Sequence, residues 1–387
     1  MRNFSSDVPA QFYIPVRLSR PVPGAKCGPA AGLLRAGQFD QGILQARNGL
    51  FPDMNPGGPI SSQQVFARVT ESARVAVEGN LHKLTFQAMN TECRVQVLGA
   101  SAEQTREYLR EVVLWVAGFE ARYSRFLPDS LVGRINAAAG RDWVEVDAET
   151  ERLFALCHEL AFFTRGAFDP TALPLIRLWN WRANPPVLPE ESALQAAREL
   201  VGWRKVQRRP GGVFLPQRGM CLDLGGIGKE YAVDWVVGMA LERGFPNVLV
   251  DFGHDVRVRG AAPGKKFWWI GLEDAQRPGQ CWTGAAVTDH AVATSGDYIR
   301  HFQINGRRYG HIIDPRTGYP VDNGCRAASV IAPSCTIAGI LSTTALILGA
   351  QEGLRLIETH LGAAGAITTD TNRIYSKRFP EFTRPTQ

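Results

Sequence analysis

The first clear period of apolar residues lies at residues 83–98, where apolar and polar positions alternate. This alternation predicts one or two strands with a bend at residues 89–91. A helical period follows, because the apolar residues between Leu109 and Phe119 fall on one face of a helix. The folded part of the chain therefore begins with strands and continues with an amphipathic helix.

The residues before this point have a different texture. Residues 1–80 show little periodicity and are rich in Pro, Gly, Ser and Gln, which predicts a poorly structured leader with a short strand at residues 12–16. We expect one domain to follow, over residues 81–387.

The same patterns predict the remaining elements. Turns separate short apolar runs from longer amphipathic ones, and no internal repeat is present. We expect helices at 147–164, 190–201, 229–243, 336–348 and 351–361, and strands at 220–224, 248–252, 267–272, 327–332 and near 366 and 374, with a short hairpin near 211–212.

Composition narrows the class of protein. The chain has 387 residues, 45% of them hydrophobic and 21% charged, as in ordinary soluble domains. The net charge of +6 comes from dispersed basic residues without a Lys/Arg block, which argues against nucleic acid as a partner. Seven widely spaced cysteines without a Cys-x-x-Cys pair predict buried thiols.

The sequence also bears on location. No apolar run reaches the roughly 18 residues of a membrane span, and the N-terminus lacks a secretory pattern. As the sequence is written we expect a cytoplasmic protein, and a misassigned start leaves a periplasmic or membrane-anchored one open.

Two polar clusters are the strongest candidates for chemistry. Residues 293–298 read Ala-Thr-Ser-Gly-Asp-Tyr, and residues 311–318 read His-Ile-Ile-Asp-Pro-Arg-Thr-Gly. Asn305-Gly306 between them predicts a tight hairpin turn that brings the two clusters together. The clusters form either a functional site or a polar hairpin with an Asp-capped turn.

Two further stretches carry candidate chemistry. Residues 220–229 predict a strand, a glycine turn and a helix start, where backbone amides and Lys229 suit a phosphate. The spacing does not fit a Walker loop, so a plain strand-turn-helix joint remains the alternative. Residues 166–171 end a helix, and Asp169 is either a site residue or a turn aspartate that bonds its own backbone.

The order of the motifs resembles the FAD:protein FMN transferases, the ApbE family, over roughly residues 83–378. The resemblance rests on Met89-x-Thr91, Ser124-x-Phe126-x-x-x-Ser130 with Asn136, Gly166-Ala-Phe-Asp-Pro-Thr171, Asp223-Leu-Gly-Gly-Ile-Gly-Lys229, Thr294-Ser-Gly-Asp-Tyr298 and His311-Ile-Ile-Asp-Pro-x-Thr-Gly318. It implies a magnesium-dependent transferase that cleaves FAD, releases AMP and joins FMN through a phosphoester to a Thr or Ser of an acceptor flavoprotein.

The resemblance also implies a fold and a site. With the element count it predicts an α+β protein of mixed, mainly antiparallel sheets with flanking helices, and FAD in a cleft between two lobes. By position the FAD contacts would be Met89, Phe126, Ala167, Phe168, Asp169, Asp223, Lys229 and Ile312. His311 would be the catalytic base, and the alternative is a histidine that only ties the hairpin to a neighbour.

One departure concerns the metal. The family carries Ala-Asp-x-x-x-Thr where this chain has Ala338-Gly339-Ile-Leu-Ser-Thr343, so Thr343 and the carbonyl of Gly226 remain as magnesium ligands without the carboxylate. Asp255 and Asp314 are candidates for the missing oxygen. Glu230 after the lysine, Asn90 and His254 are lesser departures from the family pattern.

The missing carboxylate leaves two alternatives to a working transferase. One is a catalytically impaired FAD-binding protein, and the other is a pyrophosphatase that hydrolyses FAD without an acceptor.

Overall fold

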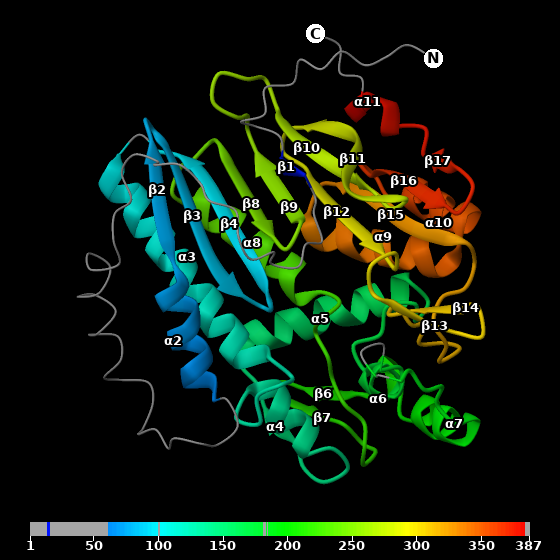
Figure 1. Ribbon diagram of the computed structural model, residues 1–387. Helices are drawn as coiled ribbons and strands as arrows, with labels where there is room; N and C mark the ends of the chain where they lie inside the picture. The colour runs from blue at the N-terminus through cyan, green and yellow to red at the C-terminus, as the bar shows by residue number, and fades with distance from the viewer. Residues whose placement is uncertain (1–13, 16–60, 100, 181–182, 184, 384–387) are drawn as a thin grey trace.

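A nine-stranded sheet organises the part of the chain that the computed structural model describes, residues 14–15, 61–99, 101–180, 183 and 185–383 (Figure 1). Every neighbouring pair of strands in it is antiparallel. In spatial order the strands are β17 (Arg373–Tyr375), β16 (Ala364–Thr369), β15 (Cys325–Ala332), β12 (Ala291–Gly296), β9 (Asp255–Arg259), β8 (Val248–Phe252), β4 (Thr91–Leu98), β3 (Leu81–Ala88) and β2 (Arg74–Glu78).

Both faces of this sheet are covered. Helices pack on one face and form the larger core with it; they are α2 (Ser62–Ser72), α3 (Ala102–Tyr123), α8 (Gly228–Glu242), α9 (Cys335–Leu348) and α10 (Ala350–Thr359). On the other face lie β1 (Ile14–Pro15), β10 (Trp268–Asp274), β11 (Arg277–Val287) and α11 (Phe379–Thr383). Because apolar layers lie on both sides, all five residues of β8 are buried.

Smaller elements form a second lobe below the main sheet in Figure 1. They are α4 (Leu131–Ala137), β5 (Val144–Glu145), α5 (Ala148–Phe163), α6 (Leu173–Leu178), α7 (Glu191–Glu199), a 3₁₀ turn (Trp203–Lys205), β6 (Gln207–Arg209) and β7 (Gly212–Phe214). A hairpin of β13 (His301–Ile304) and β14 (Arg307–Gly310) contributes to a separate apolar cluster with α6 and α7. The predicted α+β class with mainly antiparallel sheets is confirmed.

Two tight turns follow the sequence prediction closely. Met89 and Asn90 join β3 to β4 with φ angles of 51° and 59°, and Asn305 and Gly306 join β13 to β14 with φ angles of 50° and 77°. Positive φ at both central residues is the geometry of two-residue hairpins.

The predicted leader is wrong for its last 20 residues and otherwise lies outside the described residues, apart from Ile14–Pro15 in β1. Ser61 and Gln64 form a reciprocal capping box that starts α2, and α2 buries Val65 and Val69 against α3. This helix is short, and the Pro- and Gly-rich residues around it mask its period. β2 continues from it to the edge of the sheet.

The strand predicted at residues 220–224 is also wrong, because this segment is extended without a strand partner. The side-chain amide of Asn136 makes two hydrogen bonds with the backbone of Leu222: it donates to the carbonyl at 3.0 Å and accepts from the N–H at 2.6 Å. The N–H of Asp223 donates to the carbonyl of Pro170 at 2.7 Å. A side chain and a loop therefore satisfy the backbone groups that a sheet would otherwise pair.

Five of the six cysteines in the described residues are buried, as the sequence predicted. Among the same residues no helix is both long enough and apolar enough to cross a membrane.

Candidate functional site

The turn at Met89 is held from the helical side. Its N–H donates to Oε2 of Glu120 on α3 at 2.8 Å, and Oε1 of Glu120 accepts from Arg68 of α2 at 2.6 Å. A positive φ is strained for a methionine, so these bonds stabilise a conformation that the residue alone disfavours. The helix missed in the sequence thus supports the first motif.

The loop of residues 124–130 presents an aromatic ring to solvent. Ser130 caps α4 by accepting from the N–H of Gly133 and donates to the carbonyl of Ser124 at 2.7 Å. Phe126 is 67% exposed, with the Arg125 guanidinium 4.6 Å from its ring centroid. An exposed phenylalanine held in a closed loop is available to a flat ligand.

The segment of residues 166–171 contacts the glycine turn, residues 223–229. One oxygen of Asp169 accepts from the N–H and hydroxyl of Thr171, and the other accepts from the N–H of Trp203 at 2.9 Å. Asp169 is therefore a turn aspartate whose two oxygens are both engaged. Ala167 and Phe168 are buried, and the Phe168 ring lies against Gly226, 3.6 Å from where a Cβ would stand.

The glycine turn leaves a helix start open. Asp223 accepts from the N–H of Gly225 at 2.9 Å and pairs with Arg125 at 3.4 Å. Gly225 and Gly226 are exposed, and no side chain caps the N-terminus of α8. The N–H of Gly228 donates to the carbonyl of Leu224 at 2.7 Å. The amides that follow it lie at the positive end of the helix dipole, so this end suits an anion.

A buried charge cluster lies directly behind the turn. Lys229 donates to Asp255 and lies 3.6 Å from Oε1 of Glu230. Burial opposes the charge of Lys229, but Asp255 and Glu230 outweigh it and raise the lysine pKa. Burial raises the pKa of Glu230 to about 7, against the effect of Lys229, and also raises the pKa of Asp255.

Thr343 belongs to a group of hydroxyls between α9 and β12. Its hydroxyl lies 2.7 Å from that of Ser295, which lies 2.8 Å from that of Ser342. Ser342 also donates to the carbonyl of Gly339. Ser295 comes from the motif 294–298, so one of the two polar clusters reaches the helix that carries Thr343.

His311 stands at the end of β14, and its ring is oriented by one backbone group. Nδ1 lies 3.2 Å from the carbonyl of Arg300, which also accepts the His311 N–H. Because a carbonyl only accepts, Nδ1 carries the proton and Nε2 keeps its lone pair. Burial and the charge of Arg300 lower the pKa of His311 to about 4, so the ring is neutral at pH 7.

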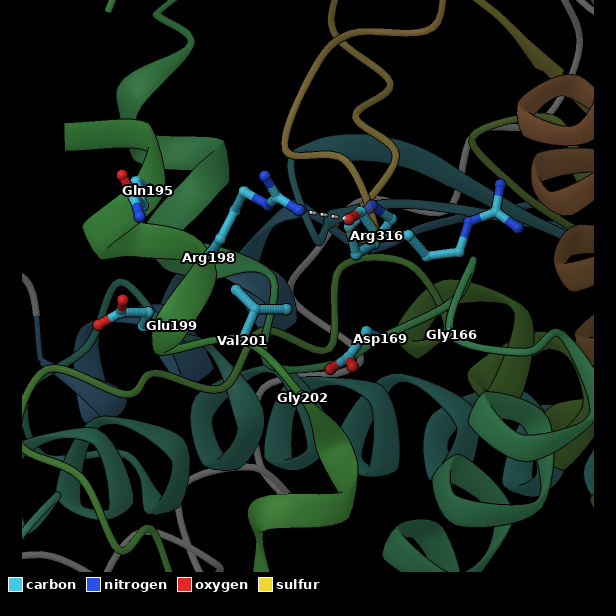
Figure 2. Close-up of a pocket in the computed structure, with 9 residues that line it drawn as sticks. Gly166, Asp169, Gln195, Arg198, Glu199, Val201, Gly202 and Arg316 are labelled. Atoms are coloured by element: carbon cyan, nitrogen blue, oxygen red, sulfur yellow. Dashed lines mark hydrogen bonds between the residues drawn. The ribbon is translucent and has the colours of Figure 1, made fainter. Parts of the chain in front are cut away.

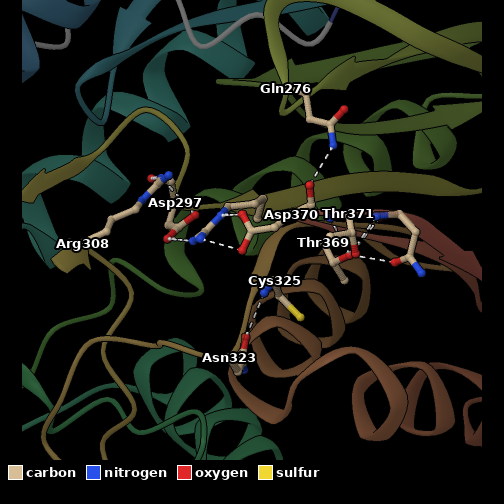
Figure 3. A network of polar contacts seen from close by, with 10 residues as sticks. Gln276, Asp297, Arg308, Asn323, Cys325, Thr369, Asp370 and Thr371 are labelled. Atoms are coloured by element: carbon tan, nitrogen blue, oxygen red, sulfur yellow. Dashed lines mark hydrogen bonds and ion pairs between the residues drawn. The ribbon is translucent and has the colours of Figure 1, made fainter. Parts of the chain in front are cut away.

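An ion-pair network fixes the hairpin that carries His311 (Figure 3). Asp297 is buried and bonds Arg308 of β14 at 3.2 Å and Arg326 of β15 at 3.4 Å, and Arg326 also pairs with Asp370. A Cβ on Gly310 would stand 2.9 Å from the Cβ of Asp297. Asp297 of the first polar cluster thus contacts the hairpin directly before His311, and it is a positioning residue.

A cavity of about 480 Å³ lies between two of the motifs (Figure 2). Gly166 and Asp169 line one side, and Arg316 of the motif 311–318 lines another, with Arg198 of α7 donating to its carbonyl at 3.4 Å. This volume is in the range of small-molecule sites.

The predicted site residues do not form one connected group. Phe126, Phe168, Asp169, Asp223 and Gly226 are linked by contacts, and Lys229 continues from them into the charge cluster. Met89 stands on its own turn, and Thr343 on α9. Among the described residues no hydrogen bond joins the His311 side chain to the other site residues, and the side chain of Ile312 packs against the larger core.

Metal-ligating side chains of the usual kind are sparse. The described residues contain no group of three His, Cys, Asp or Glu side chains arranged around a common point. Magnesium, however, prefers oxygen from carboxylates, hydroxyls and carbonyls. The hydroxyl of Thr343 and the carbonyl of Gly226 are of this kind, and one buried carboxylate oxygen, Oε2 of Glu230, has no hydrogen-bond partner.

Comparisons with known proteins agree on one class. The chain has the fold of two solved structures: the ApbE protein of Thermotoga maritima (TM-score 0.71, 31% identity, 79% of this chain and 99% of that one) and the flavin transferase ApbE of Vibrio cholerae (TM-score 0.69, 26% identity, 80% and 99%). Fold and motif order therefore define a protein of the flavin transferase class.

Sequence relatives support the same assignment. A Treponema pallidum protein named FAD:protein FMN transferase is 33% identical over 294 residues, covering 71% of this chain and 80% of that protein. One from Vibrio cholerae is 31% identical over 242 residues, covering 61% and 72%. The model of the ApbE family matches residues 89–368. The chain belongs to the ApbE family.

Proposed function

We propose that this protein is an FAD:protein FMN transferase. It cleaves the pyrophosphate of FAD, joins FMN through a phosphoester to a Thr or Ser of an acceptor flavoprotein and releases AMP. The observation that carries the proposal is the open helix start of the glycine turn with Lys229 behind it, in a chain that belongs to the ApbE family.

The FAD contacts that we propose surround this turn. Exposed Phe126 offers a stacking surface, and the cavity beside Asp169 takes one end of the dinucleotide. Phe168 and Asp169 act by shaping the loop, because the ring lies against Gly226 and both carboxylate oxygens are engaged. The full set is Met89, Phe126, Ala167, Phe168, Asp169, Asp223, Lys229 and Ile312.

The chemistry is a phosphoryl transfer, in which a protein mainly positions groups and offsets charge. The acceptor hydroxyl oxygen forms a bond to the FMN phosphorus, the bond from that phosphorus to the bridging oxygen breaks, and AMP leaves with the electron pair. Lys229 and the amides that start α8 offset the pyrophosphate charge. The hydroxyl proton passes to Nε2 of His311, which the Arg300 carbonyl leaves unprotonated.

Magnesium suits oxygen donors of the kind found in this turn and on α9. We propose that the carbonyl of Gly226 and the hydroxyl of Thr343 hold it, and that when bound it neutralises charge on the phosphate oxygens. We propose an acceptor protein as the partner. Nucleic acid is not proposed, because the basic residues are dispersed and form no Lys/Arg block.

The test is transfer to an acceptor. The purified chain, FAD and magnesium are incubated with a flavoprotein domain that carries a Thr or Ser flavinylation site, and covalent flavin is read as fluorescence in a denaturing gel. We expect a fluorescent acceptor band with the wild-type chain and little with His311→Gln. Absence of covalent flavin on cognate acceptors, with FAD bound, would overturn the proposal.

A further inference from the structure

The strongest unexplained feature of the site is the pair formed by Glu230 and Gly339. Glu230 is 8% exposed, and its Oε2 is buried with no hydrogen-bond partner in the part of the chain that the structure describes. A Cβ built on Gly339 would stand 2.6 Å from Cγ of Glu230 and 3.1 Å from its Oε1. The Glu230 side chain therefore fills the space where a side chain at position 339 would begin.

A buried carboxylate oxygen without a hydrogen-bond partner lowers the stability of the fold, so an unpaired one in a native structure needs an explanation. Lys229 does not supply one, because it bonds Asp255 and lies at 3.6 Å only from the other Glu230 oxygen. A cation that binds this oxygen satisfies it.

The neighbours of Glu230 are oxygen donors suited to such a cation. Gly339 and Thr343 are four residues apart on α9 and so lie on one face of the helix, one turn from each other. The Glu230 carboxylate packs on Gly339 and therefore lies over the face of α9 that also carries Thr343. Glu230 also lies in the first turn of α8, immediately after the glycine turn.

The other candidate carboxylates are engaged elsewhere. Asp255 is bonded to Lys229. Oδ1 of Asp314 accepts from the N–H and Nε of Arg316, and its Oδ2 accepts from Nη2 at 2.7 Å. Asp255 is thus paired with a lysine and both oxygens of Asp314 are engaged, whereas Oε2 of Glu230 has no partner among the described residues.

We propose that Glu230 supplies the carboxylate ligand of the divalent cation, reaching from α8 across Gly339 to the site that Thr343 and Gly226 complete. This inference rests on the proposed function only for the identity of the phosphates that the cation would contact. The cation site itself does not depend on that function. Gly339 is then required by Glu230, and the carboxylate that the sequence lacks on α9 is present on the facing helix.

Manganese titration of the flavin-free full-length chain tests the ligand. Mn²⁺ is a probe for oxygen sites, and its free concentration is measured by electron paramagnetic resonance. We expect one site in the wild type and binding weaker by about tenfold or more in Glu230→Gln, because the charged ligand is lost. Glu242→Gln, on an exposed position of the same helix, is the matched control and should bind as the wild type does.

A swap of the two positions sharpens the test. Gly339→Asp alone should lower the melting temperature, because its Cβ collides with Glu230. Glu230→Ala with Gly339→Asp should remove the collision and restore Mn²⁺ binding to within a few-fold of the wild type.

Three results would overturn the proposal: no Mn²⁺ site in the wild type, unchanged binding in folded Glu230→Gln, or no restoration in a folded double variant. Each is independent of flavin transfer. If flavin transfer occurs but Mn²⁺ binding does not depend on Glu230, the proposed function stands and this inference fails. If Mn²⁺ binding depends on Glu230 but no flavin is transferred, this inference stands and the proposed function fails.

Discussion

Asp297 is expected to hold the hairpin that ends at His311, and Asp297→Asn is the change that tests this. The side chain of Asp297 is 5% exposed, while those of its partners Arg308 and Arg326 are 23% and 21% exposed. The change keeps the shape and removes the charge that the two arginines share.

The magnitude follows from these exposures. Breaking a buried ion pair costs about 3–5 kcal/mol when the remaining charge is fully buried. Here the remaining arginines are partly hydrated and Arg326 keeps Asp370, so we expect a loss of about 2–3 kcal/mol. For a domain of this size that corresponds to a decrease in Tm of about 3–5 °C.

The neighbouring arginine on β14 offers a matched control. Arg307 pairs with Asp322 at 3.1 Å, but these side chains are 63% and 56% exposed. Such pairs contribute about 0–1 kcal/mol, so Asp322→Asn should change Tm by about 1 °C or less.

Function should separate the two variants as well. Because Gly310 packs on Asp297 directly before His311, Asp297→Asn should lower kcat for flavin transfer more than it raises KM for FAD. Thermal unfolding and transfer rates are measured side by side on both variants. Equal melting temperatures and equal kcat for Asp297→Asn and Asp322→Asn would refute the positioning role.

Three further predictions concern His311 and Asn136. His311→Gln should lower kcat by about 10²–10⁴-fold in the transfer assay while FAD affinity, measured by titration calorimetry, stays within a few-fold; loss of affinity without loss of kcat would contradict the base. The folded-state pKa of His311 is about 4, below its ordinary value of 6.5, so its contribution to stability is complete above pH 6.5 and is lost as the pH falls toward 4. In urea unfolding of the flavin-free protein, the free energy of unfolding should therefore decrease less over that pH range in His311→Gln than in the wild type. Parallel pH dependences in the two proteins would contradict the lowered pKa of His311. Asn136→Ala removes both hydrogen bonds to Leu222 and should lower the free energy of unfolding by about 1–3 kcal/mol. It should also raise KM for FAD, because Asp223 is displaced. An unchanged KM would show that these two hydrogen bonds do not position the site.

The sequence predicted the parts of the fold that have a local cause. The Asn305-Gly306 turn was predicted because both residues accept positive φ. The Met89-Asn90 turn was predicted from the alternating apolar residues on either side of it. The central strand at Val248–Phe252 is apolar except for Asp251, as expected for a strand covered on both faces.

The errors share a different cause, because both depend on distant contacts. Helix α2 is too short to show a period among its Pro- and Gly-rich surroundings, and it is stabilised by packing on α3 and by the Arg68–Glu120 pair. The extended segment at 220–224 reads as a strand, but a side chain on α4 and a loop carbonyl take its hydrogen bonds.

The site shows the same division. Motif order identified the residues around the glycine turn, yet Asp169 bonds its own turn, which the local Asp-Pro-Thr pattern also allowed. The proposed role of Glu230 had no signal in the sequence beyond a departure from the family pattern. Only the packing of α8 on α9 brings this carboxylate to Gly339.

The measurement that tests the central claim most directly counts both products of the same reaction. The wild-type chain is incubated with FAD, magnesium and an acceptor flavoprotein domain, and AMP and covalent flavin are quantified on the same samples. The account predicts equal amounts of the two, with neither formed when magnesium is removed by a chelator. AMP in excess over covalent flavin would indicate hydrolysis of FAD, and bound FAD without AMP would indicate a flavin-holding protein; either result would contradict a transferase.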